Sequence, residues 1–307
     1  MLATNADRLV EAAVGGQVWP PAADKNPYKV DSEGVPAVTL GMAGICFTHR
    51  VGDPAFGWEA DHLEPAVSMR HPQPAAEHAL HYMVCIGNDA VITSGACAGV
   101  RGIVTGEHAH VLVDFPPDEV ELLTIGDKIQ IRAVGLGLRL SDYPGIAIHK
   151  CSPRLIERLQ LNERADRKVE VPVVAEIPPY LMGSGGELNA DYVDQDFMTG
   201  DRSELRRLGL DRLRIGDVVA VPDHNHMWGR GFHKGAMTIG LIIHGDSAWT
   251  GHGPGVLDLM STLGDEIVPV LDADANIAIR LNIRSREELA NRVSEGRTSS
   301  FAHLQTQ

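Results

Sequence analysis

Short apolar runs separated by glycine-containing turns dominate the middle and the last third of the chain. Between residues 79 and 134 they read HYMVCIG, AVITSG, RGIVTG, HVLVDFP and DKIQIRAVG, and a second glycine-punctuated region runs from 214 to 283. Apolar or alternating runs of about four to eight residues, bounded by turn residues, are typical of β-strands. The pattern therefore predicts two β regions.

Four helices are predicted around and between these regions, from residues that start or stop a helix. Serine, asparagine and aspartate cap helix starts, proline fits the first turn, and glycine ends a helix. The signals are Asn5 before ADRLVEAAV with Gly15 as stop, Ser152 and Pro153 in SPRLIERLQL, DRSELRRLG with Gly209 as stop, and Ser285 with Glu288 before Gly296.

The two β regions share a weak internal echo. LTIGDKIQI at Leu123 and LRIGDVVAV at Leu213 both lead from a Gly-Asp turn into an alternating strand. Two related barrels would produce this echo, although such turns are common before strands. We expect a mostly β chain with two small glycine-rich barrel-like modules and a few short helices. The expected divisions are an N-terminal helix and docking arm (1–40), a first β module (41–150), a helical and loop connection (151–209), a second β module (210–283), and a C-terminal helix and tail (284–307).

Charge and composition narrow the classes of partner. The 307 residues include 41 acidic and 27 basic ones, a net charge of −14, with no basic stripe. This charge repels nucleic acid and anionic membrane surfaces. No run of about 18 apolar residues could span a membrane, and the N-terminus lacks a signal-like segment. Four widely spaced cysteines without a C-x-x-C motif suggest buried thiols rather than disulfides. We expect a cytoplasmic protein without nucleic-acid or membrane partners.

The stretch DHNHMWGRGFHKGAMTIGLIIHGDSAWTGHGPG, residues 223–255, holds five of the fourteen histidines. If HNH is a strand, His224 and His226 share a face and could bind one divalent metal; if it is a turn, Asp223 and His226 could converge. His244 ends the apolar run AMTIGLII, at a strand end where sites are often built. The sequence is compatible with both arrangements.

Two further residues of this stretch have candidate roles. Asp246 lies two residues after His244, where a carboxylate could bind a metal or fix the tautomer of an imidazole. His252 is enclosed in GHGPG, whose glycines let a ligand approach the main chain closely. This loop is predicted to border a site.

Smaller concentrations of chemistry occur earlier in the chain. The segment ADHLEP contains His62 and Glu64, which could act as an acid/base pair or as metal ligands. TGEHAHVLVDF repeats the HxH spacing with His108 and His110, on a strand face expected to be partly buried. Ser94 lacks a nucleophile elbow, and the glycines at 135–137 lack the rest of a dinucleotide fingerprint. No nucleotide cofactor is expected.

Four segments that cover most of residues 27–283 carry a family resemblance: GDPAFGWEADHLEPAVS, CIGNDAVITSGACAGVRGIVTGEHAHVLVDF, IGDKIQIRAVGLGL and LRIGDVVAVPDHNHMWGRGFHKGAMTIGLIIHGDSAWTGHGPGV. Through them the chain resembles the bacterial and archaeal family called domain of unknown function 4438. The resemblance implies a mostly β fold and assembly into oligomers, and it implies no particular reaction.

The same resemblance bears on single residues. The family element Asp-x-x-His-x-x-Gly-Arg falls on Asp223, His226, Gly229 and Arg230. The resemblance also implies that His224 departs from relatives, which often have a smaller residue there, and that SGACAG departs at Ala96 and Cys97. This favours Asp223 and His226 over the HNH pair as functional residues.

Two classes of function fit these groups. The first is an enzyme that hydrolyses a small polar carbonyl or amide substrate with a divalent metal, zinc or manganese; a likeness in style to mostly β acetamidase/formamidase proteins favours an amide. The alternative is a non-catalytic binder of a small molecule or anion, or a metal-free acid/base lyase or isomerase. For the hydrolase, the expected metal ligands are Asp223, His226, His244 and Asp246, the catalytic residues are His252, Glu64, His62 and Arg230, and the substrate-binding residues are Lys234, Gly253, Gly255 and Ser94.

Overall fold

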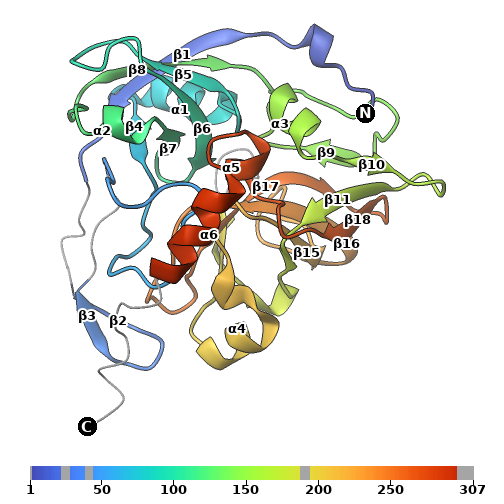
Figure 1. The fold of residues 1–307 in the computed structure, drawn as a ribbon. Coiled ribbons are helices and arrows are strands. Elements are labelled where there is room, and N and C mark those ends of the chain that lie inside the picture. Colours follow the sequence, from blue (N-terminus) through green and yellow to red (C-terminus); the bar gives the residue numbers. More distant parts are fainter. Residues whose placement is uncertain (1, 22–27, 39–43, 187–193, 296–307) are drawn as a thin grey trace.

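The structure, a computed structural model, describes residues 2–21, 28–38, 44–186 and 194–295 (Figure 1). It contains a closed barrel and a larger open sheet. The mostly β fold with barrel-like modules and a few short helices, expected from the glycine-punctuated strands, is thereby confirmed. No helix within the described ranges is long and apolar enough to cross a membrane.

The barrel is formed by six antiparallel strands. Along β8, Ile129, Ile131 and Ala133 are buried while the residues between them are exposed, the two-residue alternation of a strand with one face on a core. In order around the barrel the strands are β1 (Ala12–Val18), β4 (Val67–Arg70), β7 (Val111–Asp114), β6 (Arg101–Glu107), β5 (Asp89–Ile92) and β8 (Lys128–Ala133).

The second half of the chain forms most of the larger sheet. Its central strand β17 is buried along its whole length, including the polar side chains of Asp258, Ser261 and Thr262. The strands, in order, are β12 (Ala175–Glu176), β15 (Val218–His224), β16 (Phe232–Ile242), β17 (Gly255–Thr262), β14 (Gln195–Phe197) and β13 (Met182–Gly185), with β9 (Ile146–Ile148) also paired to β17.

Two small sheets and short helices complete the fold. In Figure 1, α5 and α6 cross the front of the molecule and the β2–β3 hairpin projects at its lower left. The small sheets are β2 (Tyr28–Val30) with β3 (Pro36–Val38), and β10 (Asn162–Glu163) with β11 (Val169–Val173) and β18 (Ile267–Leu271). The α-helices are α1 (Pro74–Met83), α2 (Pro117–Val120), α3 (Pro153–Arg158), α4 (Arg202–Leu208), α5 (Ile277–Arg280) and α6 (Arg286–Glu295).

Three predicted helix starts or stops are confirmed. The Ser152 hydroxyl accepts a hydrogen bond from Leu155 N at the start of α3, and Gly209 ends α4 in the left-handed conformation with φ +73°. Ser285 and Glu288 form the reciprocal capping box before α6. Gly296 and the predicted polar tail lie outside the described residues.

The predicted N-terminal helix is wrong. Only one 3-10 turn, Ala6–Arg8, forms there, and β1 follows it. A Cβ on Gly16 would lie 2.5 Å from the carbonyl oxygen of Arg70, so glycine allows β1 to approach β4. Asn5 caps no helix with its side chain, which instead donates to Gly137 O and accepts from Arg139 N.

The run HYMVCIG was expected to be a strand, but its first three residues end helix α1. Pro74 starts this helix, and Glu77 and His81, four residues apart on one face, interact within it. The buried ion pair of His81 with Glu107, on β6, anchors the helix to the barrel. The periodicity of a short apolar run is compatible with a helix or a strand, and here the tertiary contacts favour the helix.

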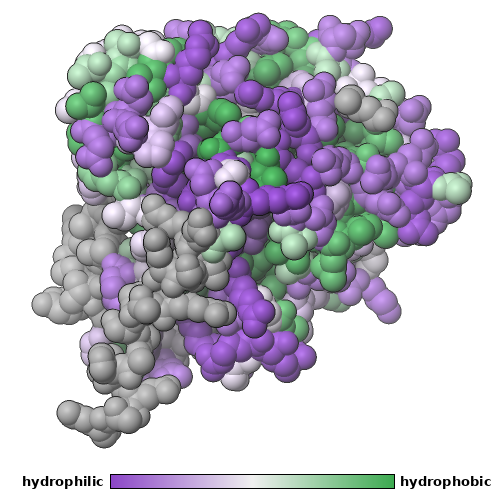
Figure 2. All heavy atoms as spheres, viewed as in Figure 1, coloured by the Kyte–Doolittle hydropathy of each residue, from purple (hydrophilic) through white to green (hydrophobic). Residues whose placement is uncertain are grey.

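The surface is in keeping with the charged composition. On the face drawn in Figure 2 the described residues are mostly hydrophilic, and the hydrophobic ones form scattered patches. Two large apolar side chains near the tip of the β15–β16 hairpin are exposed to solvent, Trp228 at 81% and Phe232 at 72%.

Candidate functional site

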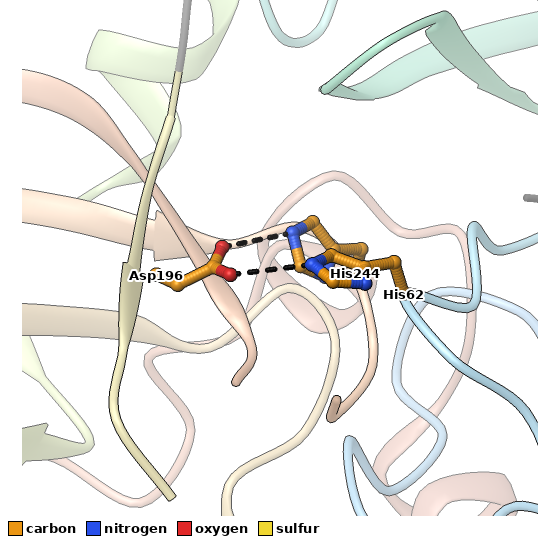
Figure 3. A group of neighbouring side chains, drawn as sticks. All are labelled: His62, Asp196 and His244. Carbon is orange, nitrogen blue, oxygen red and sulfur yellow. Dashed lines mark ion pairs between the residues drawn. The ribbon is translucent and has the colours of Figure 1, made fainter. Parts of the chain in front are cut away.

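Three histidines and two aspartates from distant segments meet between the barrel and the larger sheet. His62 lies in the loop before β4, and His108 follows β6 of the barrel. His244 follows β16, while Asp194 and Asp196 lie at β14 of the larger sheet. Figure 3 shows His62 and His244 directed at the two oxygens of Asp196. The site is therefore assembled by tertiary structure from both halves of the chain.

His62 is held in place through its backbone and through Nδ1. Its φ of +47° is uncommon for a residue with a side chain, and its N–H donates to Asp246 O at 3.1 Å. Nδ1 lies 2.7 Å from Asp61 Oδ2, and Nε2 lies 3.3 Å from Asp196 Oδ2. Burial alone would lower the pKa of His62, but hydrogen bonds to Asp196 and Asp61 raise it to about 9.

His244 is fully buried and has a comparable arrangement. Its Nδ1–H donates to the carbonyl oxygen of Gly245 at 2.8 Å. Nε2 faces two carboxylates, with Asp194 Oδ2 at 3.2 Å and Asp196 Oδ1 at 3.3 Å. Burial opposes its protonation, yet the hydrogen bonds to Asp194 and Asp196 raise the pKa of His244 well above its usual value.

His108 is oriented by Glu64. The Glu64 carboxylate lies 3.0 Å from His108 Nδ1 and 2.8 Å from His110 Nδ1, and it accepts a hydrogen bond from Ser68 Oγ at 2.6 Å. Burial would raise the pKa of Glu64, but the hydrogen bonds from His108 and His110 lower it to about 2. Glu64 is fully buried, so it acts on the site through His108.

The same nitrogen, Nδ1, is held by an acceptor on each of the three rings. Nδ1 of His62, His108 and His244 is bound to an oxygen that can only accept, so each neutral ring carries its proton on Nδ1 and its lone pair on Nε2. Metal-binding histidines are oriented in this way by carboxylates and carbonyls. Two donor groups could each hold a metal: His62, Asp196 and His244; and His108, Asp194 and His244.

The donor spacing also fits a small divalent cation. Bonds of about 2.1 Å separate neighbouring ligands by about 3.0 Å in octahedral and 3.4 Å in tetrahedral geometry. Nε2 of His244 lies 3.2 and 3.3 Å from the two aspartate oxygens. Mixed imidazole and carboxylate donors suit zinc or manganese.

His252 connects this centre to a cleft. Its Nδ1 lies 2.9 Å from Asp196 Oδ2 and 3.1 Å from His62 Nε2, and its side chain is 24% exposed. The cleft, about 580 Å³ in volume, is bordered by His252, His224, Arg230 and Phe232. A molecule in the cleft can therefore reach an imidazole that contacts Asp196.

Gly253 and Gly255, which were predicted to bind substrate, leave space for the side chains of the two aspartates and His244. A Cβ on Gly255 would lie 2.0 Å from Asp194 Oδ2 and 2.4 Å from His244 Nε2. Gly253 N donates to Asp196 Oδ2 at 3.4 Å, and a Cβ there would meet a backbone carbonyl oxygen at 2.0 Å. The glycine-rich loop is thus needed for close packing against the acidic side chains.

Trp249 covers one side of the histidines. Its ring meets those of His62 and His252 edge to face, at centroid distances of 5.7 and 5.4 Å. The Lys29 ammonium, from β2, lies 3.8 Å from the centroid of the Trp249 ring. The fluorescence of the Trp249 side chain should therefore respond to changes at the centre.

The structure brings together His62, His244 and His252 among the predicted residues and leaves three predicted ligands apart. His226 Nδ1 lies 3.3 Å from Asp258 Oδ1 in a fully buried pair. Asp223, with φ +53°, accepts from Gly235 N in the β15–β16 hairpin. Asp246 bonds to Thr199 Oγ1 and pairs with Arg202, both at 2.6 Å.

The remaining predicted residues lie at or outside the cleft. Arg230 borders it, and its guanidinium donates to Gly183 O at 3.3 Å. Lys234 is exposed on β16 and is not among the residues that border the cleft. Ser94 belongs to a barrel turn, where its hydroxyl contacts Asp127 and accepts from Lys128 N.

The interpretation of the sequence missed Asp194 and Asp196. Both lie in the segment DQDF, and side chains two apart on a strand project to one face. The intervening Gln195 contacts His224 instead, through Oε1 at 2.8 Å. The Asp-x-Asp spacing before a short apolar run was the available signal.

Comparison with known proteins identifies the family. The description "Domain of unknown function (DUF4438), N-terminal" matches residues 28–157, and the corresponding C-terminal description matches residues 158–281. The solved structure described as "Crystal structure of TM1086" shares 40% sequence identity with a TM-score of 0.85, over 90% of this chain and 98% of that one. No curated protein matches. Since the two family regions cover most of the chain, the protein belongs to the DUF4438 family.

Proposed function

We propose that the protein is a metal-dependent hydrolase of small polar substrates with a carbonyl or amide group. One observation carries the proposal: three imidazoles, each with Nδ1 bound to an acceptor, lie beside a pair of aspartates in two groups whose donor atoms are within 4.8 Å of one another. Carboxylates and imidazoles in this arrangement fit a divalent metal, as argued above. When bound, such an ion polarises a carbonyl and lowers the pKa of water toward about 7.

His252 is the proton-transfer group in this proposal. A carboxylate only accepts, so Nδ1–H of His252 donates to Asp196 and leaves Nε2 as the base. Nε2 would take a proton from the attacking water as its oxygen bonds to the carbonyl carbon. The same proton would pass to the leaving nitrogen as the C–N bond breaks. Asp196 then stabilises the imidazolium between these steps.

The cleft beside His252 is the proposed substrate site. It combines the cationic Arg230 with the apolar face of Phe232 and the amide of Gln195. A site of a few hundred Å³ with a few convergent polar groups suits a small organic molecule. Arg230 would hold a carbonyl or carboxylate oxygen of the substrate, because its guanidinium donates several hydrogen bonds.

The test is turnover by full-length, tag-free protein loaded with Zn²⁺ or Mn²⁺, on a panel of amides, lactams and lactones. We expect hydrolysis of at least one class, abolished in Asp196→Asn and kept in the matched control Asp223→Asn. Asparagine retains the oxygen that accepts from Gly235 N, and it tolerates the left-handed backbone at 223. Protein that binds neither metal would contradict the proposal.

A metal-free acid/base lyase or isomerase is the second candidate. The hydrogen-bonded pair of Asp196 and His252 at the cleft favours it, since such a pair can move protons without a metal. The two candidates differ in their response to chelators. Turnover that survives complete removal of metal would favour the second.

We also expect the protein to act in the cytoplasm as a homo-oligomer, without nucleic-acid or membrane partners. The net charge of −14 supports the exclusion of polyanions, and the family resemblance supports assembly. Sedimentation equilibrium would test the oligomer, and a monomer at all concentrations would contradict it.

A further inference from the structure

We propose that the centre holds two divalent ions rather than one. The inference rests on the proposed metal binding and deepens it. The donors form two groups with a single shared member: His62 and Asp196 with His244, and His108 and Asp194 with His244. Within each group the donor atoms lie within 4.8 Å of one another.

The rings of His62 and His108 point to two positions. They are stacked with their planes 2° apart and their centroids separated by 5.7 Å. A metal bound to an imidazole lies close to the ring plane, along the nitrogen lone pair. Among the described residues, each of the two donor groups contains one of these histidines, and neither group contains both. His62 and His108 therefore bind different ions.

His244 lies between the two positions. Its ring centroid is 5.1 Å from that of His62 and 4.2 Å from that of His108. Nε2 has one lone pair and ligates one ion, although it lies near both Asp194 and Asp196. The other ion keeps one imidazole and one carboxylate and takes solvent in its remaining positions. Ions about 3.5–4 Å apart are typical of two-metal hydrolytic sites.

The negative charge of the centre also favours two divalent ions. Four carboxylates contribute, Asp61, Glu64, Asp194 and Asp196, and none is more than 7% exposed. Among the described residues, every ion pair recorded for these four is with an imidazole. Imidazoles that bind metal are neutral. One divalent ion would leave two negative charges buried, whereas two ions balance all four, and buried net charge is costly.

Metal counting on the full-length, tag-free protein tests this. We would titrate Mn²⁺ and Zn²⁺ separately and measure the bound ions per chain by native mass spectrometry and elemental analysis. Two ions per chain are expected in the wild type, and one in Asp194→Asn and in His108→Gln. Asp223→Asn is the matched control and should retain both. Circular dichroism and melting temperature identify any variant that fails to fold, and the isosteric Asp194→Asn guards against that outcome.

Electron paramagnetic resonance gives a second readout that is independent of activity. Two Mn²⁺ ions in one centre are exchange-coupled and give a multiline spectrum, which Asp194→Asn should convert to the six-line spectrum of an isolated ion. One ion per wild-type chain, or two uncoupled ions, would overturn the two-ion proposal while leaving metal-dependent hydrolysis intact. Absence of any bound ion would overturn both proposals.

Discussion

A single methyl group added at Gly255 should disable the metal centre while changing no ligand. In Gly255→Ala, the new Cβ would lie 2.0 Å from Asp194 Oδ2 and 2.4 Å from His244 Nε2. Ordinary contacts to carbon are about 3.5 Å, so these atoms must retreat by about 1.5 and 1.1 Å. Metal–ligand distances tolerate about 0.2 Å.

The displacement predicts the loss of at least one ligand. Disturbing groups that merely orient the ligands already costs about 10- to 100-fold in metal affinity. We therefore expect Gly255→Ala to weaken Mn²⁺ or Zn²⁺ binding by about 100-fold or more, which is about 3 kcal/mol. Isothermal titration calorimetry measures the affinity, and Trp249 fluorescence follows the same titration.

Gly251→Ala is the matched control in the same loop. Its added methyl meets nothing within 4 Å, and its φ of +84° limits the cost to backbone strain of about 1–3 kcal/mol in stability. The control should bind metal like the wild type. If Gly255→Ala folds normally and binds metal with wild-type affinity, the ions do not lie at Asp194 and His244, and the reasoning fails.

Three further changes test other parts of the account. His252→Gln should lower kcat by about 100- to 10,000-fold with metal content unchanged, and a kcat within twofold of wild type would exclude His252 as the proton carrier. Asp61→Asn removes the carboxylate behind His62 and should weaken metal binding by about 10- to 100-fold in calorimetric titrations; unaltered affinity would contradict the role given to Asp61. His81 is buried between Glu107 and Glu77; burial opposes its charge, but the two carboxylates raise the pKa of His81 to about 9. Protonated His81 should stabilise the fold by about 3 kcal/mol, fully below pH 6.5, and this contribution should disappear as the pH rises through 9. In urea unfolding, the stability of the wild type should therefore fall over this pH range by about 3 kcal/mol more than that of His81→Gln. Identical pH profiles for the two proteins would refute the assignment.

The elements that could be predicted from sequence are those with local causes. The Ser152 cap and the Ser285 capping box depend on residues within one turn, and both form. The prediction of an N-terminal helix fails because Gly15 and Gly16 allow close approach to Ile129 and Arg70, far away in sequence, and do not end a helix. Local patterns cannot reveal such a contact.

The histidines of the centre that could be predicted are those with a recognisable local sequence context. A histidine in a glycine-rich loop, such as His252, and a histidine at a strand end, such as His244, are recognisable from their neighbours. The meeting of His62 with Asp196 joins residues 134 positions apart, which no local pattern encodes. The HxH spacing of His224 and His226 pointed elsewhere, because His226 is buried against Asp258 and His224 hydrogen-bonds Gln195.

The metal centre is tested most directly by anomalous X-ray diffraction from crystals of the full-length protein grown with Zn²⁺ or Mn²⁺. The account predicts strong anomalous density within about 2.1 Å of Nε2 of His244 and of an oxygen of Asp194 or Asp196. Density confined to other sites, or none at these residues in a crystal soaked at saturating metal, would contradict it.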